Sequence, residues 1–268
     1  MNKFRHEPSS CRIITKIIDG KAEQLEDQLI GEYPLTLCIN GDEWITLLSS
    51  RGAEAYLAVG FLYSEGLIKH VDEINDLQID FESGRVDIST NIKMDIQASL
   101  KGKRTVTTGC GKGTIFYDVL DALTAKPIND HFMIRPQTIL QVSMEFNQKS
   151  KLFRETGGVH ACALCDSSIR IFHEDIGRHN ALDKVIGHSL TEKLSTRGKW
   201  LLTSGRLSSE IVIKSAKNNI AMLVSRSAPT DLAVELADSL DMTLIGFARS
   251  NRMNIYAGAQ RVLISEKE

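Results

Sequence analysis

Short runs of alternating apolar and polar residues dominate the first third of the chain. These runs are rich in β-branched and aromatic side chains, and ESG at residues 82–84 suits a hairpin turn. The pattern predicts five strands, at residues 13–18, 34–39, 43–48, 77–81 and 85–90. Cys38 lies within the second of these strands and is expected to be a core residue.

One helical segment interrupts these strands. In AEAYLAVGFLYSEG, residues 53–66, the side chains Tyr56, Val59, Gly60 and Tyr63 recur at helical spacing. The glycine at the end of the segment suits the end of a helix. A single helix is therefore expected within an otherwise strand-rich region.

From residue 169 onward, short apolar runs alternate with amphipathic segments. Strands are predicted at 169–174, 199–204, 221–226 and 242–249, with helices at 181–194, 208–219 and 230–240 between them. Leu232, Leu236 and Leu240 form one stripe of the last helix. The strands are almost continuously apolar, as in a sheet buried on both faces. This βαβαβ order predicts helices packed on a largely parallel sheet.

Start signals accompany the predicted helices. The serine pair at 208–209 and Thr230 are expected to cap two of them, and Asn180 is expected to cap the helix before these. Pro136 suits the first position of a further helix over 137–154.

These patterns divide the chain into three parts. Residues 1–105 are predicted to form a strand-rich domain with one helix, residues 106–134 a mobile glycine-rich cysteine loop and linker, and residues 135–268 an α/β domain. The length of 268 residues suits one large domain or two modest ones.

Composition narrows the classes of function. Hydrophobic residues make up 42% and charged residues 25%, which is typical of a globular protein. The formal net charge of −2 argues against binding of duplex nucleic acid through overall basicity. No apolar stretch approaches the length of a membrane span, and the basic N-terminus has no apolar core behind it. A cytoplasmic protein that binds neither nucleic acid nor membrane is therefore expected.

The most unusual of the five cysteines is Cys110, which lies in the loop sequence TTGCGKGT. Flanking glycines allow close approach to the sulfur, and Lys112 with the basic residues before it would lower the thiol pKa. These features favour a nucleophilic or sulfur-carrying cysteine, and the alternative is an incidental loop cysteine. Cys11 is either a reactive cysteine or part of a frayed terminus, and the second interpretation is favoured.

The segment HACALC contains a C-x-x-C pair, Cys162 and Cys165, with His160 upstream. It is compatible with a zinc half-site, a redox dithiol or two small residues of an apolar core segment. No second C-x-x-C or spaced histidine pair completes a zinc site, and the signature of the zinc deaminases is not met. The apolar neighbours favour the core interpretation, and no structural metal is expected.

Polar motifs follow the predicted strands. EDIGRHNALDK places Glu174, Asp175, Arg178 and His179 where α/β sheets bind ligands, and the alternative is a structural turn with an ion pair. Three further loops, SGRLSSE, SRSAPTD and FARSNR, each offer arginine and serine. Together with helix N-termini, these residues favour a phosphate-bearing ligand.

Several long motifs, in order, resemble those of the formate dehydrogenase accessory sulfurtransferases. They are AVGFLYSEGLI, TGGVHACAL, EDIGRHNALDKVIG, SGRLSSEIVIKSA and SAPTDLAVELADSLDMTLIGFARSNRMNIY. The resemblance runs from about residue 12 to 260. It implies a cytidine-deaminase-like three-layer core with an additional domain, and a homodimer. It also implies a role in which persulfide sulfur passes from a cysteine desulfurase to the molybdenum of bis(molybdopterin guanine dinucleotide), which formate dehydrogenase requires.

The resemblance also implies site residues. Cys110 takes the place of the first cysteine of a loop C-x-x-C, whereas Gly113 stands in place of the second. The stretch that contacts the cofactor in the family corresponds to Phe247, Ala248, Arg249, Ser250, Asn251 and Arg252.

Three alternatives remain open. A non-catalytic chaperone of the molybdenum cofactor is favoured by the missing second cysteine, and a zinc-dependent deaminase-like hydrolase would use His160, Cys162 and Cys165. The loop could also fold back, so that one of the C-x-x-C thiols resolves a persulfide on Cys110.

Overall fold

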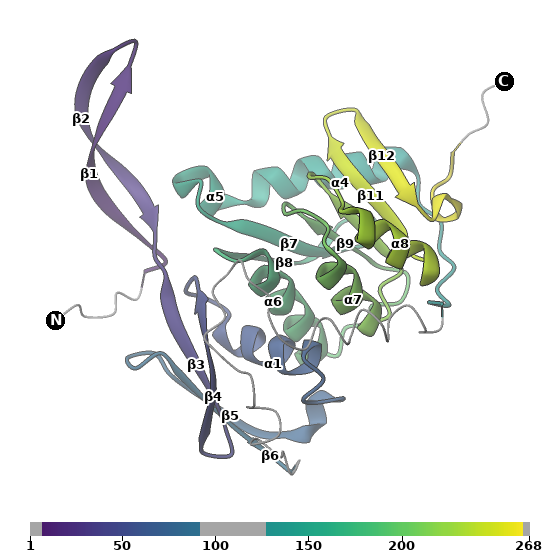
Figure 1. The fold of residues 1–268 in the computed structure, drawn as a ribbon, viewed down its shortest axis with the longest axis horizontal. Coiled ribbons are helices and arrows are strands. Elements are labelled where there is room, and N and C mark those ends of the chain that lie inside the picture. The colour runs from purple at the N-terminus through teal and green to yellow at the C-terminus, as the bar shows by residue number, and fades with distance from the viewer. Residues whose placement is uncertain (1–6, 92–126, 265–268) are drawn as a thin grey trace.

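The computed structural model describes residues 7–91 and 127–264 of the chain. They form a mixed α/β structure with three sheets, one of two strands, one of four and one of six (Figure 1). The strands are β1 Ser9–Ile18, β2 Lys21–Ile30, β3 Tyr33–Ile39, β4 Asp42–Ser49, β5 Ile74–Asp80, β6 Arg85–Thr90, β7 His160–Cys165, β8 Ile169–Asp175, β9 Trp200–Thr203, β10 Met222–Ser225, β11 Thr243–Arg249 and β12 Arg252–Ala257. The helices are α1 Glu54–Ser64, α4 Pro136–Lys149, α5 Lys151–Thr156, α6 Arg178–Thr191, α7 Ser209–Lys217 and α8 Asp231–Ser239, with short 3-10 turns at Val71–Glu73 and Ala259–Arg261.

A long hairpin of β1 and β2 projects away from the body of the molecule (Figure 1). The sequence predicted β1 but missed β2, because KAEQLEDQLI is rich in residues that favour helices. Cys11 lies within β1 opposite Gln28, so the expectation of a frayed terminus was wrong. Ile13 and Ile17 remain 72% and 70% exposed on this hairpin.

The four-stranded sheet has the order β4-β3-β6-β5 and packs one face on α1. All the predicted strands of this region are present, and Cys38 is fully buried as predicted. The predicted turn before β6 is confirmed: Gly84 has a φ of +69°, and its amide donates to the Asp80 carbonyl at 3.0 Å. The predicted helix is also confirmed, and Gly66, with a φ of +71°, follows its end.

The six-stranded sheet has the order β12-β11-β10-β9-β7-β8. Only β9, β10 and β11 run parallel to one another; β7, β8 and β12 are antiparallel to their neighbours. The prediction of a largely parallel sheet therefore holds for its centre alone. The prediction missed β12 as a strand and did not assign HACALC to β7. Both strands are joined to a neighbour by a hairpin, so they lie outside the alternation of strands and helices on which the prediction was based.

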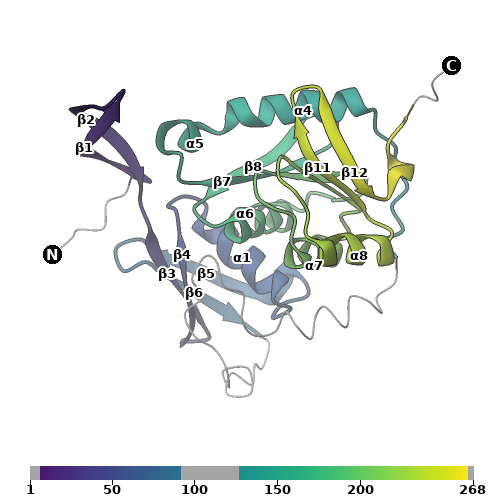
Figure 2. The same ribbon diagram turned by 45° about the horizontal axis from the view of Figure 1, so that its top comes forward.

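Helices cover both faces of this sheet and make three layers (Figure 2). Helices α6, α7 and α8 lie on one face, and α4 lies on the other. Of the three leucines predicted to form one apolar stripe, Leu236 and Leu240 are buried, whereas Leu232 is 38% exposed. The stripe is therefore buried only after the first turn of α8. The helix predicted from Pro136 is present but breaks at Ser150 into α4 and α5.

The predicted caps are partly correct. Ser208 and Thr230 occupy the N-cap positions of α7 and α8, but neither side chain makes a capping hydrogen bond. Asn180 does not cap α6, which begins at Arg178 after Gly177. Its side-chain amide instead donates to the Leu48 carbonyl at 2.8 Å, at the end of β4.

Helices α1 and α6 join the four-stranded sheet to the six-stranded one. A Cβ atom on Gly60 would lie 1.9 Å from the Asp183 carbonyl oxygen, and one on Gly187 would lie 1.9 Å from that of Tyr56. Only glycine at both positions permits this approach, so the two helix backbones are in direct contact.

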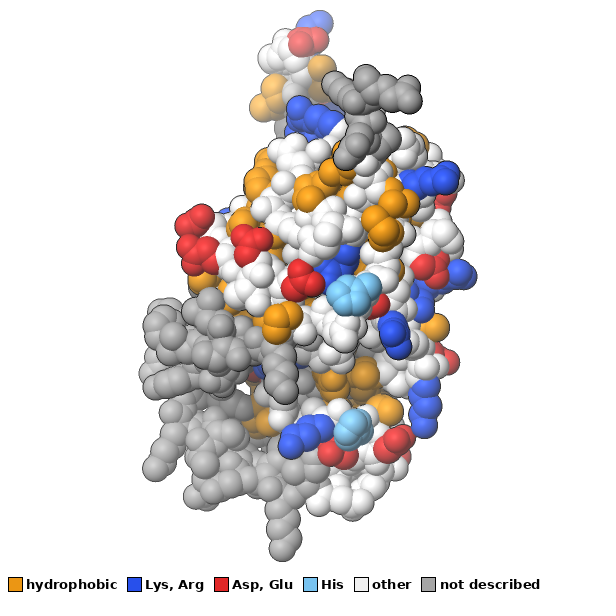
Figure 3. All heavy atoms as spheres, turned by 90° about the vertical axis from the view of Figure 1, so that its right-hand side faces the viewer, with side chains coloured by type: hydrophobic (Ala, Val, Ile, Leu, Met, Phe, Trp, Pro, Cys, Tyr) orange, Lys and Arg blue, Asp and Glu red, His pale blue; other side chains and the backbone are white. Residues whose placement is uncertain are grey.

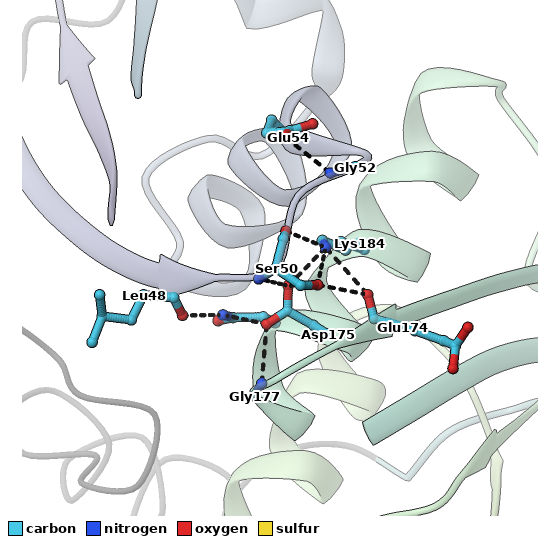
Figure 4. Close-up of polar contacts among 9 residues, drawn as sticks. Leu48, Ser50, Gly52, Glu54, Glu174, Asp175, Gly177 and Lys184 are labelled. Atoms are coloured by element: carbon cyan, nitrogen blue, oxygen red, sulfur yellow. Dashed lines mark hydrogen bonds and ion pairs between the residues drawn. The ribbon is translucent and has the colours of Figure 1, made fainter. Parts of the chain in front are cut away.

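A buried polar network lies beside this contact (Figure 4). The Lys184 ammonium lies 2.7 Å from the Asp175 carboxylate, and the two side chains are 1% and 0% exposed. Lys184 also donates to the Ser50 carbonyl at 3.1 Å, and Asp175 accepts from the Ser50 amide at 3.1 Å. The network therefore joins the residue after β4 to the end of β8 and to α6.

The face of the molecule shown in Figure 3 carries mixed charge. On the face shown in Figure 3, which includes α8, basic and acidic side chains are interspersed, with hydrophobic side chains between them. None of the helices in residues 7–91 and 127–264 is long and apolar enough to cross a membrane.

Candidate functional site

The motifs that the sequence predicts to lie at the carboxyl ends of the strands come together where β9, β10 and β11 end. Because β7 runs antiparallel to β9, its first residue lies beside the end of that strand. His160 Nδ1 is 3.3 Å from Ser204 Oγ, which also accepts the Ala161 amide at 3.0 Å. The sequence singled out His160 only as a metal ligand, and its neighbour Ser204 is 44 residues away in the chain.

Hydrogen bonds hold the three strand-end loops together. Ser225 Oγ donates to the Gly205 carbonyl at 2.6 Å, and Ser227 Oγ donates to the Ser204 carbonyl at 3.1 Å. The Phe247 amide donates to the Ser227 carbonyl at 3.2 Å. The serines of these motifs therefore build a single edge, which we call the strand-end edge: residues 204–208, 225–230 and 247–252.

The segment 247–252 contains the end of β11, the turn at residues 250–251 and the first residue of β12. Phe247 and Ser250 have φ values of +53° and +55°, in the left-handed region that few residues other than glycine adopt. The pairing register shifts by a bulge between Gly246 and Arg249. Such strained positions and bulges often occur at ligand sites, where they redirect side chains.

The two arginines of this turn face each other across the hairpin. Arg249 pairs directly with Arg252, both are exposed, and the Arg249 guanidinium lies 5.9 Å above the ring of Phe247. Like charges directly opposite each other on two strands are unfavourable. Neither arginine has an ion-pair partner among the residues that the structure describes, so this turn is suited to a bound anion.

His179 and Glu210 form a pair between α6 and α7. His179 Nδ1 lies 3.1 Å from a Glu210 carboxylate oxygen. Burial, assisted by the charges of Lys214 and Arg178, lowers the pKa of His179 to about 3, so its ring is neutral at pH 7. Burial also raises the pKa of Glu210. No local sequence signal could pair these residues, since they lie 31 positions apart on different helices.

The two acids of EDIGRHNALDK do not face the strand-end edge. Asp175 is held in the buried network with Lys184 and Ser50 described above. The Glu174 carboxylate accepts Ser150 Oγ at 2.6 Å and the Phe153 amide at 3.2 Å, which caps the start of α5. The structural alternative is therefore correct for both acids, and His179 of the same motif is paired with Glu210.

Cys162 and Cys165 lie on opposite faces of β7. Residues three apart in a strand point to opposite sides, and Cys162 packs against α6, α7 and α8 while Cys165 packs on the side of α4. They are 1% and 0% exposed, and burial raises the pKa of both thiols. The pair therefore cannot chelate one metal ion or form a disulfide with each other, and the core interpretation is correct.

Cys110, Lys112 and Gly113 lie outside the described residues. Within residues 7–91 and 127–264, no group of three or more histidine, cysteine, aspartate or glutamate side chains is placed to hold a metal ion.

Comparison with known proteins establishes the family. The model of the FdhD/NarQ family matches residues 30–263, which is most of the chain. The chain belongs to the FdhD/NarQ family. The resemblance inferred from the sequence motifs is thereby confirmed.

Relatives in this family match the chain over nearly its whole length. The sulfur carrier protein FdhD of Bacillus licheniformis is 39% identical over 258 residues, covering 96% of this chain and 98% of the relative. FdhD of Bacillus subtilis is 38% identical, covering 95% and 97%. A crystal structure described as a formate dehydrogenase accessory protein from Desulfotalea psychrophila superposes with a TM-score of 0.79 at 25% identity, covering 96% of this chain and all of that one.

Proposed function

We propose that this FdhD/NarQ-family chain is a sulfur carrier required for formate dehydrogenase activity. The names of the relatives support this role. The strongest support from the structure of this chain is the pair Arg249 and Arg252, which lie opposite each other beside a strained turn. Two neighbouring guanidinium groups suit the phosphates of a guanine dinucleotide cofactor. The proposed ligand is bis(molybdopterin guanine dinucleotide) molybdenum cofactor, bound as a substrate by residues 247–252.

Cys110 is the proposed sulfur carrier, on the basis of its match to the family motif. Its thiolate attacks the outer sulfur of a persulfide on a cysteine desulfurase; the S–S bond breaks, and the desulfurase thiolate leaves. The outer sulfur then lies on Cys110, and the exchange involves no net oxidation. In this role the chain acts as an accessory sulfurtransferase.

Delivery of this sulfur returns Cys110 to a thiolate. The S–S bond electrons stay with Cys110, so the sulfur leaves as a formally neutral atom. A reduced molybdenum centre that takes it as sulfide supplies two electrons and is itself oxidised by two. This step needs one thiolate only, so Gly113 in place of a second loop cysteine is compatible with it.

The buried C-x-x-C pair takes no part in this proposal. Both thiols are enclosed in the apolar core, and their pKa values are raised. This argues against a resolving role for Cys162 or Cys165 and against a zinc-dependent hydrolase built on them. The further elements of the proposal, a homodimer, a cytoplasmic location and a core like that of the cytidine deaminases, follow from the family resemblance.

The test is mass spectrometry of the chain after incubation with a cysteine desulfurase and cysteine. We expect one added sulfur on the peptide that contains Cys110, and its loss with dithiothreitol. Cys38→Ser removes a buried thiol and serves as the control that keeps the added sulfur. Added sulfur on another cysteine, with none on Cys110, would refute the assignment.

A second candidate function is a cofactor chaperone that carries no sulfur. It is favoured by Gly113, which removes the dithiol of the family motif. Activation of a formate dehydrogenase by the Cys110→Ala variant at the rate of the unmodified chain would support it over the sulfur carrier.

A further inference from the structure

The hairpin of β1 and β2, which we call the arm, leaves the body of the molecule without a core of its own (Figure 1). None of the three apolar cores within residues 7–91 and 127–264 includes a residue of either strand. The arm meets the body near its base, where Ile30 lies against Gly158, just after α5. Each strand has 10 residues, so the arm is about 33 Å long. A two-stranded hairpin without a packing partner is at best marginally stable in water, which points to a partner that covers it.

The two faces of the arm differ in charge. Residues directly opposite each other on antiparallel strands lie on the same face, and successive residues of a strand alternate between the faces. On one face, charges of opposite sign flank a half-buried apolar pair: Arg12 lies opposite Asp27, Ile14 opposite Leu25, and Lys16 opposite Glu23. Charged side chains of this kind keep an exposed strand in water, so this face is suited to solvent.

The other face, which we call the isoleucine face, lacks this protection. Ile13 lies opposite Glu26 and Ile17 opposite Ala22, and the two isoleucines are 72% and 70% exposed. Glu26 is the single charged side chain on this face of the two strands, whose remaining pairs are Ser9 with Ile30, Cys11 with Gln28 and Thr15 with Gln24. A strand surface with exposed large apolar residues and few charges is a site of association with another protein.

The size and charge of the arm favour a second copy of the chain as the partner. Its two strands of 10 residues offer about as many residues as one side of a standard protein interface, which has about 20–30. Residues 9–30 contain three basic and four acidic side chains, a mixture that does not suit nucleic acid or an anionic membrane. The formal charge of the whole chain is only −2, so two copies repel each other weakly. A second copy is also present wherever the chain folds, as a hairpin without a core of its own requires.

We propose that the isoleucine face of the arm binds a second copy of this chain and forms the interface of a dimer, while the face with the charge pairs stays in water. In a twofold dimer each copy presents the same surface to the other, so each change at Ile13 or Ile17 acts twice. The existence of a dimer rests on the proposed function, whereas the assignment of its interface rests on the exposed arm.

The test measures the dimer dissociation constant of the full chain by analytical ultracentrifugation, with no desulfurase, dehydrogenase or cofactor present. We expect Ile13→Lys to raise this constant by about tenfold or more, because it places a charge in an apolar interface. The new lysine would lie opposite Glu26, a pairing that favours the hairpin itself. Ile17→Thr keeps a β-branched residue in the strand and, through the lost apolar contact, should also raise the constant by about tenfold or more.

Two control variants should leave the dissociation constant unchanged. Lys16→Gln alters the face of the arm that carries the charge pairs. Leu232→Lys makes an apolar-to-lysine change on α8, in the body of the molecule, at a residue that is 38% exposed.

Amide hydrogen exchange of residues 9–30 provides a second measurement on the unmodified chain, so it does not depend on the folding of any variant. We expect protection of these amides at concentrations above the dissociation constant and its loss on dilution, because the arm has no other packing along its length.

Three results would overturn the proposal. They are an unmodified chain that stays monomeric at high micromolar concentration, exchange of the arm amides that is independent of concentration, and a dimer whose dissociation constant is the same in Ile13→Lys, Ile17→Thr and the unmodified chain. The last result would assign the arm to a different protein. The test is independent of persulfide formation on Cys110. Sulfur loading of a monomeric chain refutes the arm interface alone, whereas an arm-dependent dimer that takes up no sulfur refutes the sulfur carrier alone.

Discussion

Replacing Lys184 with methionine should destabilise the whole chain, because it removes one partner of a fully buried ion pair. The ammonium group lies within hydrogen-bonding distance of four oxygen atoms: the Ser50 carbonyl at 3.1 Å, Ser50 Oγ at 3.3 Å, the Glu174 carbonyl at 3.2 Å and the Asp175 carboxylate at 2.7 Å. Methionine retains the length and apolar volume of the lysine stem. The change therefore tests the charge and its hydrogen bonds rather than the packing.

The magnitude follows from what remains around Asp175. Removing one partner of a buried pair costs about 3–5 kcal/mol, mostly because a buried charge is left uncompensated. Asp175 keeps four neutral donors, the Ser50 amide and hydroxyl, the Gly177 amide at 3.0 Å and the Asn180 side chain at 2.9 Å. We therefore expect a loss near the lower limit, ~3 kcal/mol, in the free energy of unfolding.

Urea unfolding followed by circular dichroism measures this loss. The control is Lys193→Met, which removes an exposed lysine whose partner is Asp72, with side chains 73% and 78% exposed. That change should cost less than about 0.5 kcal/mol. Asp175→Asn and the double variant complete a thermodynamic cycle, and we expect the double variant to be less destabilised than the sum of the single variants.

A loss of less than about 0.5 kcal/mol in Lys184→Met would refute the reasoning, since it would equal that of the exposed control. Additive effects in the cycle would refute it too, because they would mean that the two charges do not interact in the folded chain.

Three further predictions concern packing, pH and thiol access. Gly187→Ala should prevent the close contact of α1 and α6 and lower the melting temperature in calorimetry, because its Cβ would lie 1.9 Å from a backbone oxygen; an unchanged melting temperature would contradict this. Burial lowers the pKa of His173 to about 4 and that of His179 to about 3, so both stay neutral in the folded chain while the unfolded chain gains protons below about pH 6.5. Their contribution to stability is thus full above pH 6.5 and falls as the pH drops toward 4 and 3. The variant in which glutamine replaces both histidines is the reference. The prediction would be disproved if the urea midpoint, relative to this reference, did not fall between pH 6.5 and pH 4. Cys162 and Cys165 should resist maleimide in the native chain and react after unfolding in urea, and native labelling at the rate of the unfolded chain would show that the strand is accessible.

Elements with a clear periodicity were predictable from the sequence. The helices α1, α6, α7 and α8 and the buried strands other than β7 follow from the local spacing of apolar residues. β2 was missed because its exposed residues have helix-forming character, and β12 was missed because RMNIYA lies at the sheet edge and is only half-buried. At both edges of the six-stranded sheet, hairpins make the outer strand antiparallel to its neighbour. The alternation of strands and helices along the sequence does not predict these hairpins.

For the candidate site, the sequence predicted that the motifs after the strands come together, but not the contacts that each side chain makes. Arginine and serine after successive strands do meet at one edge, as the topology requires. The roles of Asp175 and Asn180 depend on Ser50 and Leu48, more than 120 residues earlier, and local patterns contain no information about such contacts. The faces of Cys162 and Cys165 could have been assigned from the alternation of a strand, once HACALC was recognised as one.

The contact between Gly60 and Gly187 has a consequence for how the chain unfolds. Two sheets that are far apart in the sequence share one helix pair, and side chains of the buried network extend across the same junction. Neither sheet can then melt while the other keeps its packing, because separation of α1 from α6 exposes the cores of both. We therefore expect the two sheets to behave as a single cooperative unit, with one calorimetric transition and a common protection against amide hydrogen exchange.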